Sequence, residues 1–237
     1  MKLAWQQIPS TVISEILCLN ELDGVVLDTE HGCFNNETLY ACIQIITSKN
    51  KQCFVRLTDV DKTMIRYCLD AGTTGLIFST IESVEQCKKV KKYSTFPFRG
   101  GRRGLGLVRE NKWGEADLAG YSPILVAQIE THEAIQYIDE MCALRVFSHF
   151  MIGPYDLSAS LGVPGNFTSK KYLEAVNSLE ERLSISQMGV HIPTDVEKHL
   201  KKYEGYGIIA MGMDTISILE FYKQMSELID IENIGDK

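Results

Sequence analysis

Short apolar runs alternate with amphipathic stretches along the whole chain, and this alternation predicts its elements. The apolar runs have the length of buried strands, and the stretch after each has apolar positions at helical spacing. Several of these stretches open on Ser, Asp, Asn or Thr, which cap helices by accepting a backbone hydrogen bond. Strands are predicted at residues 2–8, 22–31, 52–58, 74–80, 123–130, 146–153, 188–192 and 206–213. Helices are predicted at residues 10–20, 35–50, 61–72, 82–93, 132–144, 169–186, 194–204 and 215–230.

The alternation favours an α/β fold, a closed (β/α)8 barrel formed by eight strand and helix units in 237 residues. Near-continuous apolar strands that alternate with helices are typical of a parallel sheet covered by helices. The alternative is an open doubly wound sheet, which would carry a Gly-rich phosphate turn after an early strand. No G-x-G-x-x-G follows an early strand, and "GGRRGLG" at residues 100–106 lies in an irregular segment, so it is a weak phosphate-loop signal.

We expect one domain spanning residues 1–237, because no linker or low-complexity tract divides the chain. The longest connection, residues 94–122, is about double an ordinary one, and loops of this size tend to be lids, binding loops or subunit contacts. Its arginines either pair with acidic surface or guide an anionic substrate, since guanidinium matches carboxylate geometry. The basic residues before and within this loop are Lys88, Lys89, Lys91, Lys92, Arg99, Arg102, Arg103, Arg109 and Lys112.

Composition and charge exclude several classes of protein. The hydrophobic content of 45% is that of a globular domain, and the formal net charge of −7 argues against a nucleic-acid partner. No apolar run approaches the roughly 18 residues of a membrane span, and the first ten residues lack a signal-peptide core, so we expect a cytoplasmic protein without a membrane partner. The seven cysteines form no C-x-x-C pair and are expected to be reduced packing residues, with Cys33 the one near candidate chemistry.

Polar side chains stand in or directly after several of the predicted strands. In a (β/α)8 barrel the carboxyl ends of the strands form one rim, where the sites of such barrels lie. Because side chains alternate along a strand, Asp28 and Glu30 share a face, as do Gln128 and Glu130. The polar residues are Asp28, Thr29, Glu30 and His31 at the end of the second strand, Arg56 in the third, Gln128 and Glu130 in the fifth and Asp156 after the sixth.

These residue types favour a site for a hard divalent ion. Glu130 and Asp156 are carboxylates from neighbouring strands and could hold such an ion with water completing its shell, whereas no Cys or His cluster indicates zinc. Arg56 is costly in an apolar strand unless it is paired, so it meets either Asp28 or Glu30 on the adjacent strand or an anionic ligand. Taken singly, each acid could also be a loop cap.

Five segments resemble the HpcH/HpaI aldolases, metal-dependent class II pyruvate aldolases related to the citrate lyase β-chain and to phosphoenolpyruvate-utilising barrels. The likeness runs in order from about Trp5 to Asp214, and "D-x-E-H-G" with "G-P-x-D-L-S-A-S-L-G" is specific in combination. The segments are "QQIPSTVISEIL", "DGVVLDTEHGCFNNET", "VRLTDVDKTMIRYCLDAGTTGLI", "ILVAQIET" and "FMIGPYDLSASLGVPGN".

The resemblance implies cleavage of a 4-hydroxy-2-oxo acid into pyruvate and an aldehyde, and the reverse condensation, through a metal-stabilised enolate. It implies Mg²⁺ or Mn²⁺, with Co²⁺ as a further candidate. Members are typically homo-oligomers, most often hexamers, with the last helix (residues 215–231 here) packed on a neighbouring subunit. The implied roles are Glu130 and Asp156 as metal ligands, His31 as the base with Asp70 as its helix partner, Arg56 at the pyruvate oxygen, and Gln128 and Ser158 in substrate binding.

The sequence favours one route to the enolate but leaves the aldehyde, the role of His191 and two alternative functions open. An enolate can also be avoided by a lysine Schiff base, but no Lys stands in the interior or at the carboxyl end of a predicted strand, which favours the metal route. Residues 78–81 read "FSTI" where relatives often carry "VPMV", and Tyr155 replaces a small residue, so the aldehyde is undetermined. His191 is expected to be packed and bonded to backbone, or else to face the mouth. The alternatives are an acyl-CoA or citrate-lyase-type lyase and a non-catalytic 2-oxo acid binding protein.

Overall fold

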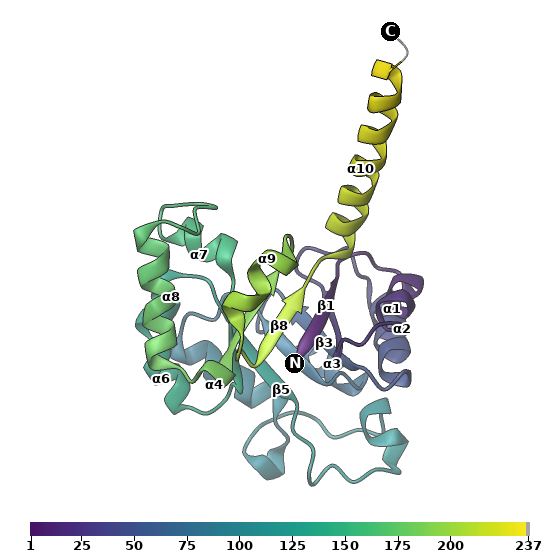
Figure 1. Ribbon diagram of the computed structural model, residues 1–237. Coiled ribbons are helices and arrows are strands. Elements are labelled where there is room, and N and C mark those ends of the chain that lie inside the picture. Colours follow the sequence, from purple (N-terminus) through teal and green to yellow (C-terminus); the bar gives the residue numbers. More distant parts are fainter. Residues whose placement is uncertain (236–237) are drawn as a thin grey trace.

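The computed structural model describes the backbone of residues 1–235 and the side chains of residues 1–228. Eight parallel strands follow one another in chain order around a closed barrel, with β8 paired to β1 (Figure 1). The prediction of a (β/α)8 barrel is therefore confirmed. The strands are β1 (Lys2–Gln6), β2 (Gly24–Asp28), β3 (Gln52–Leu57), β4 (Gly75–Phe78), β5 (Ile124–Ile129), β6 (His149–Ile152), β7 (Met188–Ile192) and β8 (Ile208–Met211).

Ten α-helices surround the barrel or extend from it. They are α1 (Thr11–Leu17), α2 (Asn36–Ser48), α3 (Lys62–Asp70), α4 (Val84–Ser94), α5 (His132–Gln136), α6 (Ile138–Ala143), α7 (Pro154–Ser160), α8 (Lys170–Arg182), α9 (Val196–Leu200) and α10 (Asp214–Gly235). Short 3₁₀ helices are η1 (Pro97–Arg99), η2 (Arg109–Gly114), η3 (Ile185–Gln187) and η4 (Lys201–Tyr203). Of the residues that open predicted helices, Asn35, Asp61 and Ser169 cap them by accepting a backbone N–H, whereas Ser10 makes no such bond. Ser83 and Thr131, which were not predicted as caps, also accept a backbone N–H.

Two helical features differ from the sequence prediction. The predicted helix at residues 132–144 is divided at Tyr137 into α5 and α6. Helix α7 was not predicted: it starts at Pro154, where the fixed φ of proline suits a first helical turn, directly after β6 ends. The second feature matters for function, because it places Asp156 in the first turn of a helix at the rim of the barrel.

The core has two layers that follow from the alternation of side chains along each strand. Outward-facing residues pack with the helices in one large cluster of buried side chains. Inward-facing residues fill the barrel axis in a second cluster, so the lower barrel is a packed plug rather than a pore. The inward-facing residues are Leu3, Trp5, Val26, Phe54, Ile77, Val126, Met151, Ile208 and Ala210.

The long connection between α4 and β5 is held to the barrel by its own arginines. It lies below the strands in Figure 1, at the end where the strands begin. Arg103 is fully buried, donates to Asp70 at 2.8 Å and pairs with Glu110, while its guanidinium stacks on Phe96. Arg109 donates to the carbonyl of Ala71. The reading in which these arginines pair locally is therefore supported by their contacts.

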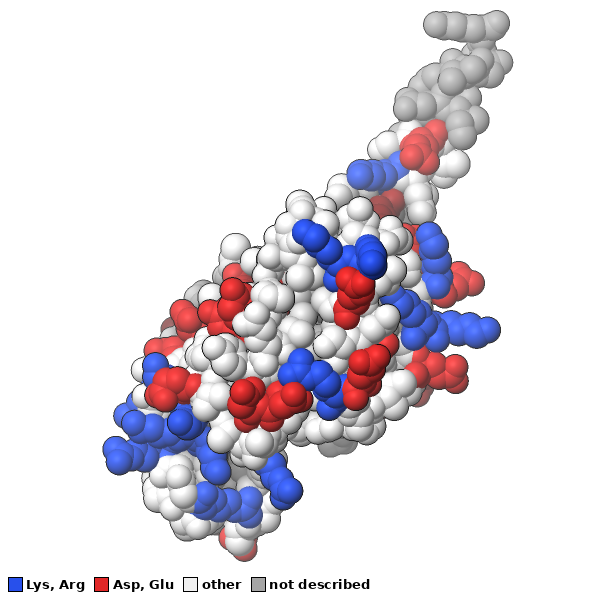
Figure 2. Space-filling model, turned by 90° about the vertical axis from the view of Figure 1, so that its left-hand side faces the viewer, with Lys and Arg blue, Asp and Glu red and all other residues white. Residues whose placement is uncertain are grey.

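Basic side chains gather at this same end of the molecule. Figure 2 shows the blue Lys and Arg side chains concentrated at the lower end, away from the C-terminal helix. Exposed basic residues of α4 and of the following loop include Lys88, Lys89, Lys91, Lys92 and Arg102. None of the basic residues of this connection lines the large pocket at the rim, so the alternative role of guiding a substrate into that pocket has no contact to support it.

Helix α10 projects from the barrel at the rim and extends into solvent (Figure 1). Its exposed apolar side chains include Ile218, Leu219, Phe221, Tyr222 and Met225. The predicted domain reaches residue 237, and residues 236–237 lie outside the described backbone, as do the side chains of residues 229–231 of the predicted interface helix. No helix in the described part of the chain combines the length and hydropathy needed to cross a membrane. All seven cysteines are unbridged, and five of them are buried, as predicted for packing residues.

Candidate active site

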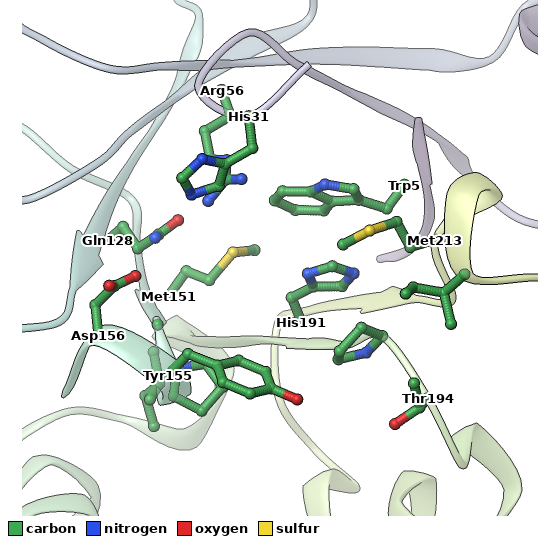
Figure 3. Close-up of a pocket in the computed structure, with 15 residues that line it drawn as sticks. Trp5, His31, Arg56, Gln128, Met151, Tyr155, Asp156, His191, Thr194 and Met213 are labelled. Atoms are coloured by element: carbon green, nitrogen blue, oxygen red, sulfur yellow. The ribbon is translucent and has the colours of Figure 1, made fainter. Parts of the chain in front are cut away.

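The polar residues at the rim continue the inward-facing series of their strands. A residue two positions beyond an inward-facing apolar residue faces the barrel axis as well, one layer higher. Arg56 and Gln128 of this higher layer line a pocket of about 400 Å³ above the apolar plug (Figure 3). The successive pairs are Val26 and Asp28 on β2, Phe54 and Arg56 on β3, Ile77 with Ser79 just after β4, and Val126 and Gln128 on β5.

Arg56 is clamped by two carboxylates of the adjacent strand. Its Nε donates to Asp28 Oδ1 at 2.9 Å, its Nη2 to Asp28 Oδ2 at 2.7 Å, and its Nη1 lies 2.7 Å from Glu30 Oε2. Burial acts to raise the pKa of the Asp28 carboxyl, but the hydrogen bonds and charge of Arg56 hold it below its usual value. The first of the two alternatives for Arg56, an ion pair with the adjacent strand, is thus present. Because a guanidinium has five N–H donors, two still have no carboxylate partner.

Trp5 stacks between this arginine and a histidine. The imidazole of His191 lies parallel to the indole at a centroid distance of 4.0 Å, and the Arg56 guanidinium lies 4.9 Å from the ring centroid. The indole N–H donates to Asp28 at 3.2 Å, and His191 Nε2 lies 2.9 Å from the carbonyl oxygen of Gly212. The two alternatives for His191 are both true: the side chain is packed and bonded to backbone, and it also lines the pocket.

Acid should destabilise the fold through His191. Burial lowers its pKa from 6.5 to about 4, so between those values the unfolded chain binds the proton more readily than the folded one. Stability is therefore full above about pH 6.5 and falls as the pH drops towards 4, by roughly 3 kcal/mol. We expect denaturant unfolding of the wild type to show this loss and His191→Gln to lack it. Equal losses in the two proteins over this range would contradict the assignment.

Glu130 is a buried carboxylate that no cation accompanies among the described residues. Its oxygens accept from the Thr80 backbone N–H at 2.6 Å, from the Thr80 hydroxyl at 2.5 Å and from the Gln128 amide. Burial raises the pKa of Glu130, the Thr80 and Gln128 hydrogen bonds lower it, and the charges of Glu30 and Asp156 raise it further. The negative charge of Glu130 is therefore not compensated, and it lies near Asp156, which lines the pocket.

This donor set fits a hard divalent cation. Glu130 and Asp156 are carboxylates from consecutive strand ends, and Gln128 adds an amide oxygen beside them. Gly153 packs against the Glu130 carboxylate so closely that a Cβ there would lie 2.6 Å from its Oε2. Groups of three or more His, Cys, Asp or Glu arranged around one metal position are not found among the described side chains, residues 1–228, so water or substrate oxygens would complete the shell.

The predicted base His31 lines the pocket, but its predicted partner lies elsewhere in the chain. His31 is exposed in the loop after β2, beside Arg56 (Figure 3). Asp70 is the last residue of α3, which runs back from the rim, so it lies at the opposite end of the barrel. There it accepts from Arg103 and lines a separate pocket with residues 104–109. Within one chain the structure does not bring Asp70 and His31 together.

The contacts of Ser158 are structural and do not involve the pocket. It is fully buried in α7, where its hydroxyl donates to the Tyr155 carbonyl at 2.7 Å and accepts from the Gly165 N–H at 2.9 Å. Both hydrogen-bonding roles of the hydroxyl are thereby used. It shapes the segment that carries Asp156 and is not among the residues that line the pocket.

Sequence reasoning missed the residues that hold the acids in place. Ser79 donates to Glu30 at 2.7 Å, and Thr80, held at a positive φ of 49°, directs both its N–H and its hydroxyl at Glu130. Both belong to the "FSTI" segment, for which the sequence indicates only a departure from the family pattern. Trp5 was missed as well, although an aromatic residue at an inward position near a strand end was a usable signal.

The sequence pattern of a known enzyme family covers most of the chain. The family described as HpcH/HpaI aldolase/citrate lyase matches residues 4–220. The chain is 27% identical over 226 residues to a 2-keto-3-deoxy-L-rhamnonate aldolase of Salmonella gallinarum, covering 91% of this chain and 84% of that protein. It is also 27% identical over 221 residues to a 4-hydroxy-2-oxovalerate aldolase of Rhodococcus jostii, covering 89% and 84%.

A solved structure of the same family shares the fold. An HpcH/HpaI aldolase from Desulfitobacterium hafniense superposes with a TM-score of 0.87 at 20% identity, covering 96% of this chain and 92% of that one. At this identity the likeness carries the fold alone. It agrees with the eight-stranded barrel described above.

Proposed function

The chain belongs to the HpcH/HpaI aldolase/citrate lyase family, a family of carbon–carbon lyases, and we propose that it cleaves or forms a 4-hydroxy-2-oxo acid as a divalent-metal-dependent pyruvate aldolase. One observation carries the proposal: Arg56, with two N–H groups that no carboxylate holds, lines the same pocket as Asp156, and the Glu130 carboxylate lies directly against the pocket residues Gln128 and Gly153. Cationic donors face uncompensated anions there, which suits a metal and an anionic 2-oxo acid bound together.

Binding of the oxo acid follows from this charge distribution. The Arg56 guanidinium is fixed by Asp28 and Glu30, so its remaining N–H groups are already aimed when an oxygen of the pyruvyl group arrives. The Gln128 side chain holds Glu130 and lies at the pocket wall. A divalent ion such as Mg²⁺ or Mn²⁺ held by Glu130 and Asp156 would supply fixed positive charge beside the developing enolate.

The reaction needs one base on the aldehyde side. His31 accepts the proton of the C4 hydroxyl, the C3–C4 bond breaks, and C4 with its oxygen leaves as the aldehyde. The electron pair of the broken bond becomes the enolate of pyruvate, which Arg56 stabilises, and a proton added at C3 gives pyruvate. His31 suits this role because it is exposed at the pocket wall beside Arg56.

His31→Ala should lower the rate of retro-aldol cleavage by about 10²-fold, the usual contribution of a general base. Oxaloacetate decarboxylation should fall much less, because it passes through the same pyruvate enolate without a hydroxyl proton to remove. Steady-state rates of both reactions in one sample measure the difference, and Mn²⁺ binding should be retained.

His132→Ala provides the control, because His132 is also exposed near the rim but does not line the pocket. This variant should leave both rates unchanged. A wild-type cleavage rate in His31→Ala would return His31 to the role of a loop residue.

Two surfaces support a homo-oligomer as part of the same proposal. Helix α10 exposes apolar side chains along its projecting length, and the loop between α4 and β5 exposes Leu105, Leu107 and Trp113. Because Asp70 is remote from His31 of its own chain, it could act as the partner of this base only across a subunit contact. Light scattering at micromolar concentration tests the oligomer and should report a mass above that of one chain.

A further inference from the structure

A second chamber lies beside the pocket. It has a volume of about 180 Å³ and lies between β7, α7 and α9. The two cavities share five wall residues, so they lie directly against each other. The shared residues are Pro154, Tyr155, His191, Pro193 and Thr194. Figure 3 shows Tyr155, His191 and Thr194 on the side of the pocket away from His31 and Arg56. We call this second chamber the annex.

The walls of the annex are aromatic and apolar. The rings of Tyr155 and Phe167 pack edge to face with their centroids 5.1 Å apart, and the ring centroids of Phe167 and Tyr172 are 5.5 Å apart. Tyr203 lines the annex as well. The hydroxyls of Tyr172 and Tyr203 have no hydrogen-bond partner within the described part of the chain. Such walls suit a flat ring or an extended carbon chain that ends in a hydrogen-bonding group.

The charge at the annex is positive. Lys202 is exposed at its outer edge, His199 lies beside it, and no carboxylate is among the described residues that line the chamber. The nearby Glu180 accepts from the Tyr206 hydroxyl at 2.7 Å and does not line the annex. This contrasts with the main pocket, where Asp156 forms part of the wall. An anionic group at the end of the ligand would therefore meet Lys202 without competition from a lining acid.

The ligand in the annex must be the aldehyde side of the substrate. Pyruvate has three carbons, and its carboxylate, carbonyl and methyl group are all used at the metal, at Arg56 and in the C3–C4 bond. Any atom that reaches beyond His191 and Tyr155 therefore belongs to the other fragment.

We propose that the aldehyde substrate has an aromatic or extended apolar body and an anionic end group, and that this body occupies the annex with the anion next to Lys202. This proposal rests on the proposed function. The aldehyde carbon stays in the main pocket, the body passes between Tyr155 and His191, and the anion lies at the outer edge. Small hydroxylated aldehydes would leave the annex unfilled.

Three benzaldehydes with one body and different para groups test this proposal: 4-carboxybenzaldehyde, 4-methylbenzaldehyde and 4-(trimethylammonio)benzaldehyde. In aldol addition with pyruvate and Mn²⁺, the wild-type kcat/KM should be highest for the carboxylate, by about five-fold over the methyl compound, the upper range for an exposed charge pair. It should be lowest for the cation. Lys202→Gln should bring the carboxylate to methyl ratio to about one, and Lys202→Glu should invert it.

Lys198→Gln serves as the matched control, because Lys198 is an exposed lysine of α9, directly before the 3₁₀ helix η4 that carries Lys202, and does not line the annex. It should keep the wild-type ratio. Equal kcat/KM values for the three aldehydes in the wild type, or a ratio that survives Lys202→Glu, would overturn the proposal. Because these are ratios within one protein, they do not depend on the absolute rate of each variant.

A binding measurement separates the failure of this proposal from a failure of the proposed function. The unreactive 4-(hydroxymethyl)benzoate should bind the wild type more tightly than 4-methylbenzyl alcohol by calorimetry, and Lys202→Glu should remove the difference. If oxaloacetate is decarboxylated but neither preference is found, the aldolase assignment stands and the annex proposal fails. If the binding preference is present but no enolate chemistry occurs, the proposed function fails and the annex still takes an anionic aromatic ligand.

Discussion

Asp156→Asn is expected to lower oxaloacetate decarboxylation by about 10³-fold or more, because it removes one of two carboxylates available to the metal. Asp156 is exposed in the first turn of α7, so the change should leave the fold intact. Steady-state decarboxylation at several Mn²⁺ concentrations measures the effect. Weak activity should return only at much higher Mn²⁺, since Asn keeps an oxygen ligand but not the charge.

The control for this variant is Glu133→Gln, a neutralised carboxylate in the first turn of α5 near the same rim that does not line the pocket. It should keep the wild-type rate and Mn²⁺ dependence. Equal Mn²⁺ dependence in wild type and Asp156→Asn would remove Asp156 from the metal site.

Arg56→Lys is expected to reduce both stability and activity. Lysine keeps the charge but loses the planar group that joins Asp28, Glu30 and the face of Trp5. Disturbing a buried pair of this kind costs about 3 kcal/mol, so the melting temperature should fall. Decarboxylation by the folded variant should fall by about 10²-fold, because the remaining N–H groups are no longer aimed at the pyruvyl oxygens.

Arg66→Lys is the matched control, because Arg66 is exposed on α3 and does not line the main pocket. It should change neither the melting temperature nor the rate. A variant Arg56→Lys that melts early yet decarboxylates at the wild-type rate while folded would show that Arg56 is structural only. A purely catalytic role predicts the reverse, with activity lost and the melting temperature unchanged.

The barrel could be predicted because its pattern is local. Each strand is a short apolar run, each helix has apolar spacing and many have a cap, and both signals are contained within a few residues. The rim site could be predicted for the same reason, since Asp28, Arg56 and Glu130 stand at the ends of readable strands and alternation sets the direction in which each side chain points.

The features of the site that could not be predicted depend on contacts between residues from different segments or on local backbone conformation. Asp70 lies beside Arg103 and not beside His31, because the end of α3 is brought back to the opposite end of the barrel. Ser158 stands in a matching motif, but its hydroxyl donates within α7 to the Tyr155 carbonyl and accepts from Gly165 in the following loop. Thr80 reaches Glu130 only through a left-handed backbone conformation that its residue type gives no reason to expect.

The most direct test of the account is aldol addition by the purified protein. Pyruvate and a panel of aldehydes, with Mn²⁺ or Mg²⁺ in one arm and excess EDTA in the other, should give a new 4-hydroxy-2-oxo acid in the metal arm alone, detected by mass spectrometry. Restoring Mn²⁺ to the EDTA arm should restore the product, because the packed barrel core contains no metal ligand and should remain folded. Product formed at the same rate in exhaustively chelated protein, or no product from any aldehyde in the metal arm, would contradict a metal-dependent pyruvate aldolase.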